Sequence, residues 1–296
     1  MSLKPVDAAL VVFDFDGTLT DVDAHAEAFY AASRQALADQ LGWDEAEHAR
    51  EWAAAFAAVM ALSATAAWQV GGRDACPARV DPYMIANSVT RRLLAEHRPG
   101  DDPSSGVASV LAVHSAAYQQ VSPQFRPDAQ RVLEQLLAGG YPVRVVSNSQ
   151  TTAIERMLDS LALAGRERVL VHGDAGKFSV CEPMVPDARF DALPETVGWW
   201  EGGRPIHVRR GKYFDVLRAI WDDTGTSSEQ TLVVGDVFEL DLAMPAALGA
   251  HIHLVTRAGT MPHERRIADD LPRGAAGAPL AAVLERLRAF GSGVPC

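Results

Sequence analysis

Short apolar segments that recur between helical patterns constrain the fold of this chain more than any other feature. The first segment, residues 10–15 (LVVFDF), is β-branched at Val11 and Val12 and ends at the turn signal Asp16-Gly17. Such short, uninterrupted apolar runs are typical of strands that are buried on both faces of a parallel sheet. Similar runs occupy Val143–Ser147, Val169–His172, Thr231–Gly235 and Ala250–Thr256.

Helical patterns fill the spaces between these runs. In Pro127–Leu137, four apolar residues (Val132, Leu133, Leu136 and Leu137) share one helix face. Further helices are expected at Thr151–Leu163, Lys212–Trp221 and Leu240–Leu248. Strands that alternate with helices at this spacing predict an α/β fold with a doubly wound, Rossmann-like parallel sheet.

The segment 21–125 departs from this rhythm because it is Ala-rich and shows no convincing strand. Its patterns predict helices at Ala24–Gln40, Asp44–Ala67, Tyr83–Glu96 and Val107–Gln120, with a loop at Gly71–Pro82. We therefore expect an all-helical cap domain at 21–125, inserted into a core domain made of residues 1–20 and 126–296. A chain of 296 residues is long enough for both.

A second, smaller insertion is expected inside the core domain at 173–205, where Gly and Pro are frequent. Its flanks, Lys177–Cys181 and Pro205–Arg209, could pair as a small hairpin.

Charge and composition limit the classes of partner. A formal net charge of −11 argues against general nucleic-acid binding, which needs surplus Lys and Arg to neutralise phosphates. The uncharged stretch Ala53–Gly72 has the length of a membrane span, but it consists mostly of Ala, which contributes little to insertion. We expect a helix within the cap, and no membrane partner. This Ala-rich segment leaves a homodimer open, because it could pack against a second subunit or equally well inside the cap.

The cysteines and the N-terminus predict a cytoplasmic protein. Cys76, Cys181 and Cys296 are far apart and form no CxxC pair, so a disulfide framework or zinc site is not expected. Residues 1–10 contain no long apolar stretch of the kind that a signal peptide requires.

Two carboxylates follow the first predicted strand, in Asp14-Phe15-Asp16-Gly17-Thr18. Because strand side chains alternate, Asp14 and Asp16 point to the same side, at the edge of the sheet where open α/β folds bind ligands. Two carboxylates this close repel each other unless a cation or shared proton offsets the repulsion. The pattern therefore favours a catalytic or metal site over a solvated turn.

Three further motifs end strands or open helices of the same predicted sheet. Ser147-Asn148 ends the second strand, where a hydroxyl can bind a phosphate oxygen beside a helix N-terminus. Lys212 opens a helix and could neutralise phosphate and carboxylates, although Arg209 and Arg210 are close by in sequence.

The last of these motifs is acidic. Asp236 follows the strand Thr231–Gly235, and Asp241 lies about one helical turn further on, with Glu239 as an alternative second acid. Mg²⁺ prefers oxygen ligands and keeps several waters, so two carboxylates and one carbonyl are sufficient to hold it.

In this order, the four motifs resemble those of the haloacid dehalogenase superfamily: DxDGT, a strand-ending Ser or Thr, a Lys, and GDxxxxD. The resemblance implies that Asp14 is the nucleophile and Asp16 the general acid and base, with Lys212 stabilising charge. It implies phosphate binding by Ser147, with Asn148 and Thr18 beside it. It also implies a Mg²⁺ site with these ligands: Asp14, the carbonyl of Asp16, Asp236 and Asp241.

The presence of Asp16 favours a phosphatase over a dehalogenase, because the dehalogenating members lack this second acid. The expected substrate is a small phosphorylated metabolite. A phosphomutase or phosphotransferase of the same fold, and a non-catalytic binding protein, are the alternatives. For the cap, we expect Arg73 or Arg79 of the Gly/Pro-rich loop to contact the substrate.

Overall fold

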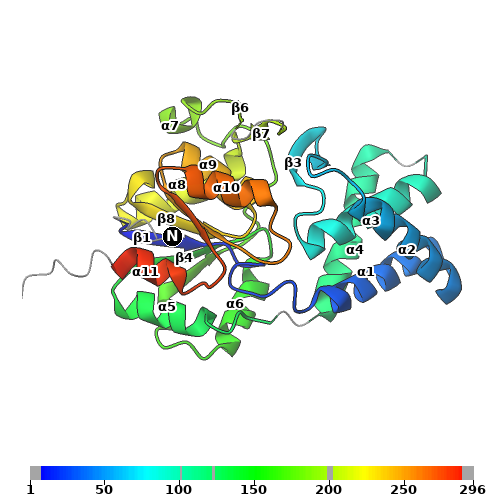
Figure 1. Cartoon of the computed structure of the whole chain (residues 1–296), viewed down its shortest axis with the longest axis horizontal. Coiled ribbons are helices and arrows are strands. Elements are labelled where there is room, and N and C mark those ends of the chain that lie inside the picture. The colour runs from blue at the N-terminus through cyan, green and yellow to red at the C-terminus, as the bar shows by residue number, and fades with distance from the viewer. Residues whose placement is uncertain (1–7, 101, 122–123, 199–202, 289–296) are drawn as a thin grey trace, which may run out of the picture. The chain divides into compact units, whose positions relative to one another are not determined.

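The computed structural model describes residues 8–100, 102–121, 124–198 and 203–288 (Figure 1). Parts of the predicted domains (residues 1–7 and 122–123) and Cys296 lie outside the described residues. Among the described residues, the chain divides into two compact units. The core unit comprises Met1–Thr20, Gln69–Cys76 and Phe125–Cys296, and the helical unit comprises Asp21–Trp68 and Pro77–Gln124.

The core unit is built on a six-stranded parallel sheet of order β10-β9-β8-β1-β4-β5. This confirms the expected doubly wound sheet. The five predicted strands are present. A sixth strand, β10, was not predicted, because its residues GAAG lack β-branched side chains. The strands are β1 (Leu10–Phe13), β4 (Val143–Val146), β5 (Val169–His172), β8 (Thr231–Gly235), β9 (His251–Val255) and β10 (Gly274–Gly277).

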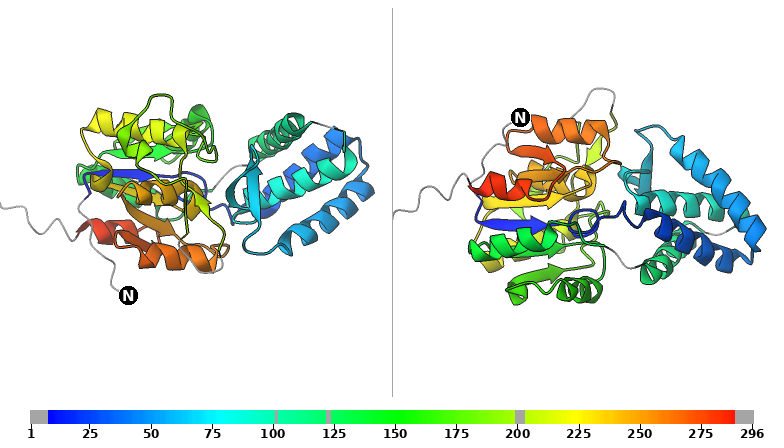
Figure 2. Two further views of the ribbon diagram at one scale, coloured as in Figure 1. Left: turned by 90° about the horizontal axis from the view of Figure 1, so that it is seen from above. Right: turned by 60° about the horizontal axis from the view of Figure 1, so that its bottom comes forward.

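Helices cover both faces of this sheet because successive strand residues point to opposite sides. On one face, Val11 and Phe13 of β1 pack with α5 (Ala129–Ala138), α6 (Thr151–Ser160) and α11 (Ala282–Arg288). On the other face, Leu10 and Val12 pack with α7 (Ala188–Asp191), α8 (Gly211–Thr224), α9 (Ala243–Ala247) and α10 (Pro262–Asp270). Figure 2 shows β1, in blue, in the middle of the core unit between these helices.

Short elements complete the core unit. Three 3-10 or π-helical turns lie at Arg166–Arg168, Ser228–Gln230 and Phe238–Leu242. At the end of the small insertion, β6 (Thr196–Val197) pairs antiparallel with β7 (Ile206–His207), which directly follows the insertion. The expected pairing of Lys177–Cys181 with Pro205–Arg209 is therefore wrong, apart from a single bridge between Cys181 and Arg210.

The helical unit contains α1 (Ala26–Leu41), α2 (Glu45–Met60), α3 (Pro82–His97) and α4 (Pro103–Gln120). The first helix packs against α3 and α4, and α3 also packs against α2. Local capping sets the boundaries: the carboxylates of Asp44 and Asp81 accept hydrogen bonds from backbone N–H groups in the first turns of α2 and α3. Gly42, in the left-handed conformation, ends α1.

The insertion is not all-helical, which corrects the prediction for 21–125. The helix expected at Asp44–Ala67 ends at Met60, and β2 (Ala67–Val70) and β3 (Arg73–Pro77) form a hairpin where a loop was expected. The turn residues Gly71 and Gly72 both have positive φ, 58° and 75°, as tight two-residue hairpins require. Residues 69–76 of this hairpin belong to the core unit, although the sequence assigned them to the cap.

Candidate active site

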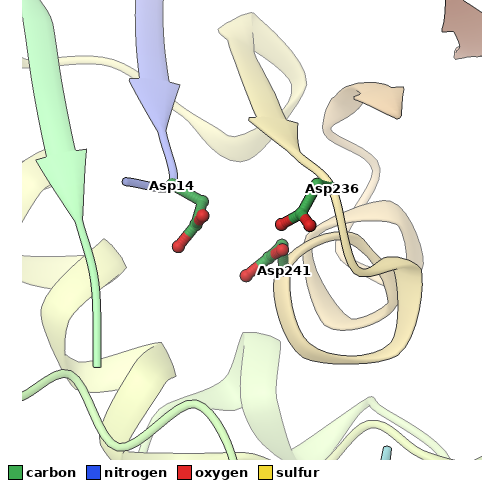
Figure 3. Close-up of side chains that lie close together, drawn as sticks. All are labelled: Asp14, Asp236 and Asp241. Carbon is green, nitrogen blue, oxygen red and sulfur yellow. The ribbon is translucent and has the colours of Figure 1, made fainter. Parts of the chain in front are cut away.

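Three buried carboxylates meet at the carboxyl edge of the sheet, as Figure 3 shows. Asp14 follows β1, Asp236 follows the neighbouring β8, and Asp241 lies in the turn Phe238–Leu242. One carboxylate oxygen of each lies within 4.8 Å of the others. The parallel pairing of β1 with β8 explains this arrangement, because both strands end at the same edge and each is followed directly by an aspartate.

Gly17 allows the turn after β1 to pass close to these acids. Its φ is +83°, a conformation that L side chains rarely adopt, and a Cβ there would lie 2.3 Å from Oδ2 of Asp236. The glycine of the first motif is therefore required by both the backbone conformation and the space beside Asp236.

Lys177 supplies a cation to the carboxylates. Its Nζ lies 2.7 Å from Oδ1 of Asp14 and 2.9 Å from Oδ1 of Asp241, and all three side chains are buried. Burial and the neighbouring Asp241 raise the pKa of Asp14 well above its ordinary value, and Lys177 partly offsets this. Burial disfavours the charge on Lys177, but the two carboxylates outweigh it and raise the pKa of this ammonium.

The lysine predicted for this role, Lys212, is not the one that contacts the acids. Lys212 lies exposed in the first turn of α8, with its aliphatic stem beside Gly176. The loop after β5 instead folds back across the end of β4, because the N–H groups of Asp174 and Ala175 donate to the carbonyls of Ser149 and Ser147. This path carries Lys177 from the edge strand to the centre of the sheet.

A signal for Lys177 was present in the sequence. The strand Val169–His172 was predicted, and Lys177 follows it in a loop with two glycines. Such a loop emerges at the same edge as Asp14 and Asp236. The direction in which the loop turns is a tertiary property.

The backbone of Lys177 is held on both sides. Its N–H donates to Oδ1 of Asn148 at 2.8 Å, and its carbonyl accepts a hydrogen bond from Nη1 of Arg210. The Arg210 guanidinium is completely buried and also donates to the carbonyls of Ala75, at 2.6 Å, and His207, at 3.0 Å. Asn148, predicted to bind substrate, thus has its carboxamide oxygen engaged in the protein.

Two serines follow β4, and one of them contacts Asp16 of the first motif. The buried Ser147 accepts a hydrogen bond at Oγ from the N–H of Ser149, at 3.1 Å. The hydroxyl of Ser149 donates to Oδ2 of Asp16 at 2.7 Å. The carboxylate of Asp16 is therefore oriented by Ser149, the residue directly after the second motif, in a contact that the sequence did not predict.

The other predicted binding residues are dispersed. Thr18 is fully buried, and its hydroxyl has no hydrogen-bond partner among the described residues. Arg73 is exposed on β3 of the core unit. Arg79 belongs to the helical unit, where its guanidinium donates to the carbonyl of Met60 at 3.3 Å and so closes the end of α2.

A second cation, Arg257, contacts Asp236 from the loop after β9. Its Nε lies 3.0 Å from Oδ2 of Asp236. Nothing in the sequence pattern distinguished this arginine from the others of the chain.

The donor set fits a hard divalent cation. Three carboxylates converge, and the buried Oδ2 of Asp14 has no hydrogen-bond partner among the described residues. A buried carboxylate oxygen without a donor is costly, and a cation would satisfy it. Oxygen-only ligands of this kind suit Mg²⁺.

The sheet order, the insertion after β1 and the buried site of acids and lysine define an α/β enzyme of the Rossmann-like class. A family model described as haloacid dehalogenase-like hydrolase matches residues 8–195. The chain belongs to this family of hydrolases, and the expected family is confirmed.

Solved structures share the fold at low sequence identity. A predicted phosphoglycolate phosphatase from Haemophilus somnus 129PT is 15% identical, with a TM-score of 0.54, over 95% of this chain and 98% of its own. The haloacid dehalogenase-like protein SP0104 from Streptococcus pneumoniae is 14% identical, with a TM-score of 0.50, over 94% and 97%. A predicted β-phosphoglucomutase from Thermotoga maritima is 14% identical, with a TM-score of 0.50, over 96% and 99%.

A search among curated proteins gives no significant match. None of the described helices combines the length and the hydropathy that a membrane span requires.

Proposed function

We propose that the protein is a Mg²⁺-dependent phosphomonoester hydrolase that acts on a small phosphorylated metabolite through an aspartyl-phosphate. The observation that carries this proposal is the buried cluster of Asp14, Asp236 and Asp241 with Lys177 bridging two of its members. Such a site has a surplus of negative charge that a bound cation would balance, and with a cation present it can accept a phosphate dianion.

In the first half-reaction, a carboxylate oxygen of Asp14 attacks phosphorus, and the bond from phosphorus to the ester oxygen breaks. Asp16 protonates the departing alkoxide, with its carboxyl held by Ser149. Ser147 and Lys177 donate to the transferring phosphoryl oxygens, and Lys177 also lowers the repulsion between Asp14 and the phosphate.

In the second half-reaction, Asp16 removes a proton from water, which attacks phosphorus and releases inorganic phosphate with Asp14 restored. Mg²⁺, bound by Asp14, Asp236, Asp241 and the main-chain carbonyl of Asp16, would supply positive charge that orients the phosphoryl group and offsets its developing charge.

The second carboxylate, Asp16, supports this reaction over dehalogenation, which needs no protonation of an alkoxide. A phosphomutase or phosphotransferase would use the same first half-reaction, but would return the phosphoryl group to an organic acceptor in place of water. A non-catalytic role is opposed by the complete set of acid, lysine and serine side chains at the site.

The test is a panel of phosphomonoesters assayed for phosphate release by the full chain, with MgCl₂ and with EDTA, beside Asp14→Asn. We expect release that requires Mg²⁺ and is lost in the variant. Phosphate release by folded Asp14→Asn at the wild-type rate would refute the proposed role of Asp14 as the nucleophile. If the wild-type protein forms the aspartyl-phosphate but releases phosphate only slowly, the phosphotransferase alternative is supported.

A further inference from the structure

The acids of the site are neutralised in part by an arginine outside the four motifs. Arg257 and Asp236 form an ion pair of 3.0 Å, and their side chains are only 4% and 2% exposed. We propose that Arg257 is the counter-ion of Asp236 in the metal-free site, and that its positive charge opposes the binding of Mg²⁺ to Asp236. The inference rests on the proposed Mg²⁺ site.

The position of Arg257 is set by its own loop. Its N–H donates to Oγ1 of Thr260 at 2.9 Å, and its carbonyl accepts the N–H of Thr260 at 3.1 Å. This reciprocal pair closes the turn that follows β9, whose strand neighbour is β8, and Asp236 directly follows β8. Arg257 and Asp236 therefore both follow neighbouring strands at the same edge of the sheet, which places the guanidinium beside the carboxylate.

Charge balance gives the arginine its role. Counted as ionised, the three clustered carboxylates carry three negative charges, and Asp16, which the proposed reaction places at the same site, adds a fourth. Lys177 and Arg257 carry two positive charges, which leaves a negative surplus that a divalent ion would cancel. Without Arg257, the negative surplus that faces the divalent ion would be larger by one charge. Buried like charges repel strongly because little water screens them, so Arg257 should weaken Mg²⁺ binding while it stabilises the metal-free fold.

A purely orienting role predicts the opposite sign. If Arg257 served mainly to hold Asp236 in the ligand conformation, removing it would weaken Mg²⁺ binding. The two roles are therefore separated by the direction of change in a binding constant that is measured without substrate or turnover.

The experiment titrates MgCl₂ alone into the full chain by calorimetry and measures Tm in EDTA and in MgCl₂. The variants are Arg257→Gln, Arg257→Lys and the control Arg144→Gln, whose ion pair with Asp223, at 2.8 Å, involves none of the site acids. We expect Arg257→Gln to lower Tm in EDTA and to tighten Mg²⁺ binding at least about tenfold, with a larger Mg²⁺-induced rise in Tm. Arg257→Lys and Arg144→Gln should keep the wild-type affinity within about threefold, as expected when the local charge is kept.

An unchanged or weaker affinity in folded Arg257→Gln would overturn the proposal. If that variant does not fold, the Nε–H signal of Arg257 in wild-type NMR spectra decides, with Arg257→Lys used to assign it. The signal should be protected from exchange in EDTA and lose protection in Mg²⁺, and equal protection in both would refute the idea. A wild-type protein with no Mg²⁺ binding at all would instead refute the proposed metal site itself.

Discussion

The ammonium of Lys177 lies 2.7 Å from Oδ1 of Asp14, although 163 positions separate them in the sequence. The same ammonium contacts Asp241, so one lysine ties together the acids that follow β1 and β8. Lys212, on α8, takes no part in this contact and is exposed.

Replacement of Lys177 by Met should therefore lower kcat/KM for the best phosphomonoester by about 10²–10³, the usual loss when one charge-stabilising donor is removed. The matched control, Lys212→Met, should stay within about twofold of wild type, as expected for a surface substitution away from the chemistry. Steady-state kinetics on both variants checks this, and a large loss confined to Lys212→Met would reverse the assignment.

Arg210 should affect catalysis through Lys177. The guanidinium of Arg210 donates buried hydrogen bonds to the carbonyls of Lys177, Ala75 and His207. Arg210→Lys removes some of these bonds, so we expect the free energy of unfolding to fall by about 1–3 kcal/mol. We also expect kcat to fall more than KM rises, because the displaced Lys177 would stabilise the transition state less. Urea unfolding and kinetics measure both effects.

The control for Arg210 is Arg209→Lys, since Arg209 pairs with Glu182 and does not touch Lys177. A loss of stability with unchanged kcat in folded Arg210→Lys would leave Arg210 with a structural role only.

Gly17→Ala should abolish Mg²⁺ binding. The new methyl group would need the space of the Asp236 carboxylate, at 2.3 Å, on top of the strain from a positive φ. Gly71→Ala is the matched control, because its φ of +58° carries a similar strain but no atom lies within 4 Å of the added Cβ. Calorimetric titration of MgCl₂ should show binding to Gly71→Ala and none to Gly17→Ala, and equal binding to both would contradict the steric argument.

His253 should make the protein less stable in acid. Burial, with a contribution from Arg286, lowers the pKa of this core histidine on β9 to about 3, from an ordinary 6.5. The unfolded chain then binds a proton between these values that the folded chain does not. The contribution of His253 to the free energy of unfolding is therefore complete above pH 6.5, and it is lost as the pH falls toward 3.

His253→Leu removes this proton uptake. Between pH 7.5 and pH 5, the variant should lose about 2 kcal/mol less unfolding free energy than the wild type, since one proton corresponds to about 1.36 kcal/mol per pH unit below 6.5. Urea unfolding at several pH values measures the two slopes, and parallel slopes would show that His253 titrates alike in both states.

The sheet could be predicted because each strand carries its own evidence. Runs such as VVF in β1 and TLVV in β8 are apolar and β-branched, and burial on both faces leaves no polar alternation to obscure them. β10 and the hairpin of β2 and β3 lack such runs. The Gly71-Gly72 turn was the available signal for that hairpin, and the loop interpretation overlooked it.

The sequence by itself determined the acids of the site. Asp14 and Asp236 directly follow buried parallel strands, and such strands end at one edge of a sheet whatever the connections between them. Tertiary structure alone decided the cations. Lys177 and Arg257 reach the acids from loops, and the path of a loop depends on hydrogen bonds to distant segments, such as those from Ala175 to Ser147 and from Arg210 to Lys177. A lysine on a helix and a lysine in a loop look alike in a sequence, because their long side chains carry no periodic signal of burial.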